Sequence, residues 1–123
     1  MSPRLWSTAL TEKASPILVT TEHVPHLEIV KVLGIVMGVT VRTRNLGAQM
    51  AAGLRTIIGG EMTAVVESLT ASRELAMDRL AANACLLGAD AVIGVRLVTS
   101  ELGDIWTEFC AYGTAVQVRK TLP

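Results

Sequence analysis

The sequence predicts a single α+β domain in which one long helix packs on a mainly antiparallel sheet. Residues 61–87 carry apolar side chains at helical spacing, while residues 28–43 and 106–119 are rich in β-branched side chains that alternate as in strands. A turn-forming TSELGD segment separates two strands after the helix. At 123 residues the chain has the length of one domain.

The first elements are an arm and a short strand. Residues 1–15 are polar and weakly patterned, which predicts a flexible N-terminal arm before a domain at residues 16–123. The β-branched run Ile17–Thr20 has the length of one strand.

The next strand, Glu28–Thr43, has apolar side chains on both parities. This pattern predicts a strand covered on both sides, either by its own fold or by another subunit. Gly34 and Gly38 interrupt it, and glycine inside a strand marks a bulge or a close backbone approach. The segment is therefore one bent strand or two shorter ones.

The segment Arg44–Glu61 is rich in glycine but does not fit a nucleotide-binding loop. It contains no lysine for a Walker-type loop, and its glycines lack the GxGxxG spacing. Its small residues instead predict a short helix, Leu46–Ile58, that another backbone can approach closely. The alternative is an anion site at which Arg42, Arg44 and Arg55 converge.

The long helix is predicted at Glu61–Leu87, with Gly88 as its C-terminal cap. A second apolar patch lies off the main stripe and is predicted to be a subunit contact. The main stripe comprises Met62, Val65, Val66, Leu69, Ala76, Leu80, Ala84 and Leu87, and the second patch comprises Ala64, Ala71, Leu75, Ala82 and Leu86.

Two strands follow the cap, at Ala89–Thr99 and Trp106–Arg119. Alternation assigns a set of apolar residues to one face of each strand. These are Ile93, Val95 and Leu97 on the first strand, and Trp106, Cys110, Tyr112, Val116 and Val118 on the second.

The composition predicts self-association. Half of the residues are hydrophobic but only 3% are aromatic, and a chain this short has more aliphatic surface than one small core can bury. Eleven basic and eleven acidic residues cancel, without a basic run, which argues against a nucleic-acid partner. Neither a membrane-spanning segment nor a signal peptide is recognisable, so a cytoplasmic protein is expected.

Several motifs resemble the YbjQ-like family, which is described as heavy-metal-binding, over about residues 17–118. They are Thr20-Thr21, Gly34, Arg44-Asn45, Gly53-Leu54-Arg55, Gly59-Gly60-Glu61, Gly88-Ala89-Asp90-Ala91 and Ala111-Tyr112-Gly113-Thr114-Ala115-Val116. The resemblance implies a dodecin-like subunit, a ring-shaped pentameric assembly and binding of a heavy metal ion, but no established reaction.

Metal ligands are sparse in the sequence. His23, His26 and Cys85 are the candidates, and a metal ion would need further ligands from a neighbouring subunit, because zinc and softer ions prefer sets of three or four Cys and His side chains. The alternative for the two histidines is a solvated loop. Cys110 shares its face with apolar residues and is predicted to be a buried thiol.

Three charged residues fall on apolar faces: Arg73, Arg96 and Glu108. They are expected to pair with one another or across subunits, or else to line an internal polar pocket. No catalytic residue is assigned. The expected function is a binding or assembly module for a metal ion or small ligand at subunit interfaces, and the alternative is an enzyme whose inter-subunit site uses Cys85 or Glu108.

Overall fold

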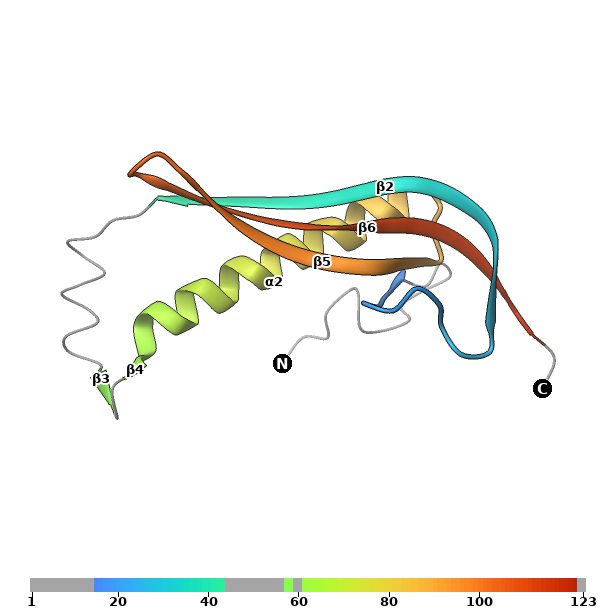
Figure 1. Ribbon diagram of the computed structural model, residues 1–123, viewed down its shortest axis with the longest axis horizontal. Helices are drawn as coiled ribbons and strands as arrows, with labels where there is room; N and C mark the ends of the chain where they lie inside the picture. Colours follow the sequence, from blue (N-terminus) through green and yellow to red (C-terminus); the bar gives the residue numbers. More distant parts are fainter. Residues whose placement is uncertain (1–14, 44–56, 59–60, 122–123) are drawn as a thin grey trace.

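A four-stranded sheet with one long helix on one of its faces forms the body of the protein (Figure 1). The computed structural model describes residues 15–43, 57–58 and 61–121. The elements are β1 (Ile17–Leu18), β2 (Leu27–Thr43), β3 (Ile57–Ile58), β4 (Glu61–Met62), α2 (Thr63–Leu86), β5 (Ala91–Leu102) and β6 (Trp106–Lys120).

The sheet has the strand order β1-β5-β6-β2. Strand β1 runs parallel to β5, whereas the pairs β5–β6 and β6–β2 are antiparallel. The predicted α+β class and the helix-on-sheet arrangement are therefore confirmed, with a mixed sheet. Strands β3 and β4 form a separate small hairpin immediately before α2.

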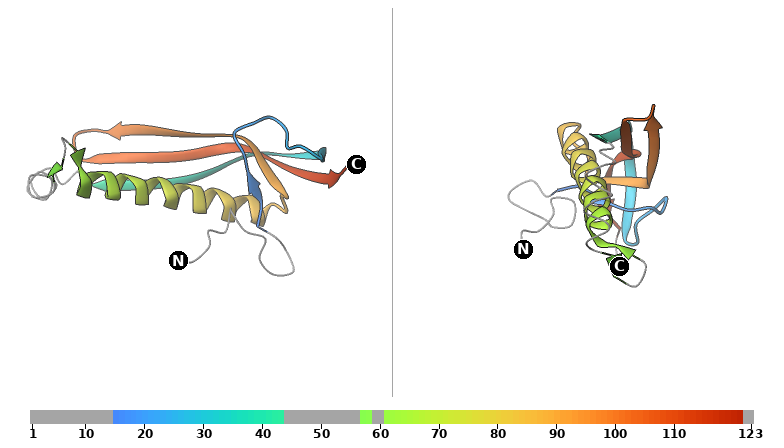
Figure 2. Two further views of the ribbon diagram at one scale, coloured as in Figure 1. Left: turned by 90° about the horizontal axis from the view of Figure 1, so that it is seen from below. Right: turned by 90° about the vertical axis from the view of Figure 1, so that its left-hand side faces the viewer.

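Helix α2 covers one face of the sheet along most of its length (Figure 2). Its fully buried side chains recur every four residues, at Ser72, Ala76, Leu80 and Ala84, as expected for one helical face. The centre of the predicted stripe is thus confirmed. Its ends differ, because Val66 and Leu87 are exposed.

The helix ends at a glycine cap, as predicted. Gly88 has a φ of 81°, and its N–H donates to the Cys85 carbonyl at 2.9 Å. The Ala89 N–H donates to the Ala84 carbonyl at 3.0 Å. These two bonds define a Schellman motif, which satisfies carbonyls that the end of a helix leaves unpaired.

Both glycines of β2 have the roles that glycine inside a strand predicts, within one continuous strand. Gly34 lies at a register shift and has a φ of 124°. At Gly38 the strand backbone touches the helix backbone: a Cβ there would lie 2.2 Å from the Ala76 carbonyl oxygen and 2.3 Å from the Leu80 nitrogen. No side chain fits between the two elements at this point.

Helix side chains also bind the outer edge of β2, which is an edge strand. Arg79 Nη1 donates to the Val39 carbonyl at 2.6 Å, and Asn83 Nδ2 donates to the Met37 carbonyl at 2.7 Å. These bonds occupy edge carbonyls that another strand could otherwise pair with.

The predicted faces of the last two strands need correction. A bulge at Gly94, with a φ of 61°, places Val92 instead of Ile93 on the inward face with Val95. Leu97 lies on this face as predicted, opposite Ala111, but is 36% exposed. On β6 the helix packs against the parity that was not predicted. Its buried members are Phe109, Ala111, Gly113 and Ala115.

Three further boundaries differ from prediction. Ile57–Ile58 and Glu61–Met62 are strands rather than helix ends, and β5 continues to Leu102, so that the turn begins at Gly103. Residues 1–14 of the predicted arm and residues 46–56 of the predicted short helix lie outside the described residues. In the part of the chain that the structure describes, no helix has the length and apolar character needed to cross a membrane.

Candidate functional site

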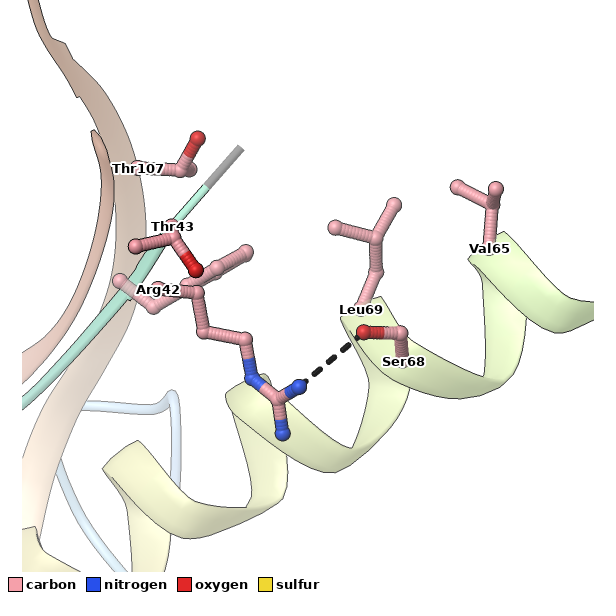
Figure 3. A pocket seen from close by; sticks show the side chains of 7 residues that line it. Arg42, Thr43, Val65, Ser68, Leu69 and Thr107 are labelled. Atoms are coloured by element: carbon pink, nitrogen blue, oxygen red, sulfur yellow. Dashed lines mark hydrogen bonds between the residues drawn. The ribbon is translucent and has the colours of Figure 1, made fainter. Parts of the chain in front are cut away.

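A pocket of about 140 Å³ lies between the end of β2 and the first half of α2 (Figure 3). Strands β2 and β6 supply its sheet side, and three side chains of the helix supply the other. The lining residues are Arg42, Thr43, Val65, Ser68, Leu69, Thr107 and Phe109. The pocket thus combines one cation, three hydroxyl groups and an apolar wall.

The side chain of Arg42 extends across the pocket from β2 toward α2 (Figure 3). Its Nη1 donates to the Ser68 hydroxyl at 3.2 Å. A guanidinium carries five N–H donors, and the bond to Ser68 uses one of them. Such a group suits a planar, negatively charged ligand such as a carboxylate.

The strand pairing explains why these residues meet. Arg42 lies opposite Thr107 in the antiparallel β2–β6 register, although the two are distant in sequence. Of the predicted anion-site residues, Arg42 lines the pocket, whereas Arg44 and Arg55 lie outside the described residues. Sequence reasoning missed Ser68 and Thr107, because hydroxyl residues on a helix and a strand carry no signal until topology brings them together.

A second feature is the sheet face opposite α2, here called the open face. On β2 the helix-facing residues Val36, Gly38 and Thr40 are buried, and the alternating residues between and beside them are exposed. Cross-strand partners on β5 and β6 extend this surface. The open face comprises Ile35 (72% exposed), Met37 (52%), Val39 (37%), Val41 (48%), Val98 (43%), Tyr112 (37%) and the thiol of Cys110.

Cys110 is buried in the middle of the open face, as predicted for a small apolar residue. It pairs with Val39 on one side and Val98 on the other. Burial, and secondly the negative charge of Glu108, raise the pKa of the Cys110 thiol. The thiol is therefore held in its neutral form.

The candidate metal ligands occupy separate places. His23 and His26 are exposed in the segment between β1 and β2, and Cys85 is half-buried in the last turn of α2. Both histidines and both cysteines of the sequence fall in the described ranges. Within residues 15–43, 57–58 and 61–121, no group of three His, Cys, Asp or Glu side chains could hold a metal ion. A heavy-metal site thus does not fit the described residues of a single chain.

The charged residues on predicted apolar faces are also placed by the structure. Arg73 is exposed on α2 rather than inside the apolar stripe. Arg96 is exposed because of the Gly94 bulge, and its Nη1 donates to the Thr20 carbonyl at 3.0 Å and to the Val95 carbonyl at 2.9 Å. These two carbonyls are its contacts within the described chain, and the predicted pairing across subunits stays a prediction.

The two residues of the enzyme alternative do not meet in the chain. Glu108 is half-buried on β6, opposite Val41 and Ser100 and near the β5–β6 turn. Cys85 lies at the other end of the fold, where the chain leaves α2 to enter β5. The enzyme alternative places either residue at a site between subunits, so it stays a prediction.

Comparisons with known proteins identify relatives over most of the chain. The YbjQ_1 family model, described as "Putative heavy-metal-binding", matches residues 16–119. A UPF0145 protein of Acidothermus cellulolyticus is 46% identical over 104 residues, which are 85% of this chain and 96% of that protein. A UPF0145 protein of Thermoplasma acidophilum is 48% identical, and the match covers 83% of this chain and 86% of the relative. A UPF0145 protein of Picrophilus torridus is 50% identical, and the match covers 81% of this chain and 85% of the relative.

One solved structure shares the fold. It is the crystal structure of a protein of unknown function from Pediococcus pentosaceus, assigned to the DUF74 family. The TM-score is 0.56 at 16% sequence identity, and the match covers 85% of this chain and 98% of that chain. At this identity the likeness concerns the fold alone.

Proposed function

The chain belongs to the YbjQ family, and from this premise we propose that it is a self-associating binding module of the cytoplasm. The open face of each copy is covered by a neighbouring copy, and the assembly holds a small ligand. The open face is the observation that carries the proposal.

The exposed side chains of the open face support self-association. Large aliphatic side chains there are between about one third and three quarters exposed, and they are contiguous across three strands. Contiguous apolar surface of this kind marks an interaction site. A second copy suits it, because the chain has no net charge that would repel a copy of itself.

A ring is the form of assembly that we favour. The helix carries a second apolar patch, with Leu75 37% exposed and Leu86 86% exposed, away from the open face. When two different surfaces of one subunit meet head to tail, the assembly closes into a ring if the rotation permits. We propose five dodecin-like subunits, as the sequence resemblance implies.

Molar mass measured by light scattering during size-exclusion chromatography tests this proposal. Met37→Lys places a charge in the centre of the open face and should reduce the mass toward that of one chain. Thr121→Lys, at an exposed position beyond β6, adds the same charge and should keep the wild-type mass. A wild-type protein that is monomeric at micromolar concentration would refute self-association.

The family description favours heavy-metal binding as a second candidate function. The described residues of one chain do not form a site, and we propose that the ligands come from two copies. Titration of metal-free protein with Zn²⁺ or Cd²⁺ should then give a stoichiometry below one ion per chain. Replacement of His23, His26 or Cys85 should weaken binding by at least about tenfold, as the loss of a ligand typically does. Unchanged affinity in all three variants would exclude these residues.

A further inference from the structure

We propose that the pocket at Arg42 binds a small organic carboxylate. This inference deepens the binding part of the proposed function by naming the ligand class, and it does not depend on the number of subunits. It rests on the size of the pocket, its charge, and the distribution of polar and apolar groups in its lining.

The size of the pocket excludes large ligands. Liquid water occupies about 30 Å³ per molecule, so a cavity of about 140 Å³ accommodates a ligand on the order of five heavy atoms. Sites for drug-sized ligands and cofactors measure roughly 300–1,000 Å³. The pocket does not enclose a nucleotide or a flavin, whereas it does enclose a carboxylic acid of about three carbons.

The polar groups of the pocket favour a negative charge. Arg42 is the one charged residue among the lining side chains, and Thr43, Ser68 and Thr107 supply hydroxyl donors. The pocket also lies beside the first two turns of α2, at the positive end of the helix dipole. An anion seated between Arg42 and Ser68 would interact favourably with all of these groups.

The apolar groups distinguish a carboxylate from an inorganic anion. Val65, Leu69 and Phe109 line the pocket, and Phe109 is only 1% exposed. Phosphate or sulfate, polar on every side, would lose hydration against this wall without compensation. A carboxylate with a short hydrocarbon tail places its charge on Arg42 and its tail on the wall.

One buried hydroxyl group close by has no partner. Thr40, two residues before Arg42 on the same face of β2, is 4% exposed, and its Oγ1 has no hydrogen-bond partner among the described residues. An unpaired buried hydroxyl is costly. Thr40 does not itself line the pocket, so a water molecule carried in with the ligand would satisfy its hydroxyl group.

Titration of ¹⁵N-labelled protein with propionate, followed by NMR, tests the inference. Amide shifts should concentrate at Ser68, Leu69 and Thr107. Propionamide, which has the same shape without the charge, should bind at least about tenfold more weakly, because it loses the charge-assisted pair. Inorganic phosphate serves as the anion without a tail and should also bind more weakly.

The variants separate the pocket from the rest of the surface. Arg42→Gln should weaken propionate binding at least tenfold, and Arg119→Gln, at an exposed arginine paired with Glu28, should not change it. Val65→Phe fills the pocket while keeping Arg42, and should also abolish binding. Shifts that are equal for propionate and propionamide, tighter binding of phosphate, or retained binding in a folded Arg42→Gln variant would each overturn the proposal.

The outcome for the carboxylate is independent of the test of self-association. The chemical shifts at Ser68 and Thr107 report the pocket, and the molar mass reports the open face. Met37→Lys should therefore bind propionate normally even when it no longer associates.

Discussion

Gly38 is the residue at which sheet and helix come closest. The contact is between two backbones, and the small residues around it, Ala76 on the helix and Ala111 on the neighbouring strand, are fully buried. Small side chains in this core therefore set the distance between the layers. Larger ones would force the helix away from the sheet.

Gly38→Ala tests this close approach. The added Cβ would overlap three backbone atoms of α2, which cannot move aside as a flexible side chain can. We expect a loss of about 1–3 kcal/mol or more in the free energy of unfolding, measured with urea. The control is Gly103→Asn in the β5–β6 turn. The φ of 68° there tolerates asparagine, and no atom lies within 4 Å of the added Cβ. This variant should change the free energy of unfolding by only about a few tenths of a kcal/mol. Equal stability of the two variants would contradict the packing described here.

Cys110 gives a prediction for pH. Because burial and then Glu108 raise the pKa of its thiol in the folded state, the unfolded chain releases this proton at lower pH than the folded chain does. The stability contributed by the neutral thiol is fully present below the unfolded pKa. It is lost as the pH rises through that value toward the folded pKa.

The measurement is the free energy of unfolding under reducing conditions at about pH 7 and about pH 10, on either side of the ordinary thiol pKa. The wild type should lose more stability over this interval than Cys110→Ala does. Identical pH profiles for wild type and Cys110→Ala would show that Cys110 is not held neutral by the fold.

At the scale of elements, α2 holds β2 both by its apolar stripe and by two polar side chains at the strand edge. Arg79 and Asn83 lie one turn apart on the helix and bind the carbonyls of Val39 and Met37. The same contacts block the middle of this edge to further pairing. Association of copies by extension of the sheet at these residues is therefore disfavoured relative to contact through the open face.

Asn83→Ala should weaken this attachment. The loss of one hydrogen bond to a backbone carbonyl predicts a decrease of about 0.5–1.5 kcal/mol in the free energy of unfolding by urea. It also frees the Met37 carbonyl, so the variant should aggregate faster on mild heating, as measured by light scattering. Thr70→Ala, at an exposed position of the same helix, is the matched control. A variant that is as stable and as soluble as this control would show that the edge contact is dispensable.

The elements differ in how well the sequence predicts them. Helix α2 and its Gly88 cap were predictable, because the apolar repeat is long and the cap has a local signal. The inward face of β6 was not, because Ala111, Gly113 and Ala115 are less hydrophobic than Cys110, Tyr112 and Val116. Their small size is a packing requirement, and at Gly113 a Cβ would overlap Val92 of the neighbouring strand β5. On β5 the predicted face is correct for Val95 and Leu97 but wrong for Ile93, because the Gly94 bulge adds one residue and reverses the alternation before it.

The same reasoning applies to the candidate site. Arg42 could be proposed from the sequence, since arginine near a glycine-rich segment suits an anion. Ser68 and Thr107 could not, because their proximity to Arg42 depends on the strand register and on the placement of α2. Local patterns thus identify the charged member of the pocket, and tertiary structure supplies the rest.

At the scale of the whole molecule, the two layers leave one sheet face without cover. Val36, Ala111 and Phe109 face the helix and are at most 5% exposed, whereas Ile35 and Met37 on the open face are more than half exposed. A strand with apolar residues on both faces is typical of a buried sheet. The predicted two-sided burial of β2 is thus met on one side by α2, and the proposed association of copies would provide the other.

Self-association should make thermal stability depend on protein concentration. If a second copy covers the open face only in the folded state, mass action stabilises that state as concentration rises. A hundredfold increase in concentration should raise Tm by roughly 5 °C or more, given the size of the chain. Differential scanning calorimetry or circular dichroism from micromolar to submillimolar concentration measures this. Ile35→Lys, which charges the most exposed aliphatic side chain of the open face, should abolish the dependence, and Thr121→Lys should preserve it. A unimolecular transition does not depend on concentration. A wild-type Tm that stays constant over this range would therefore mean that the chain unfolds as a monomer and that the open face stays uncovered in solution.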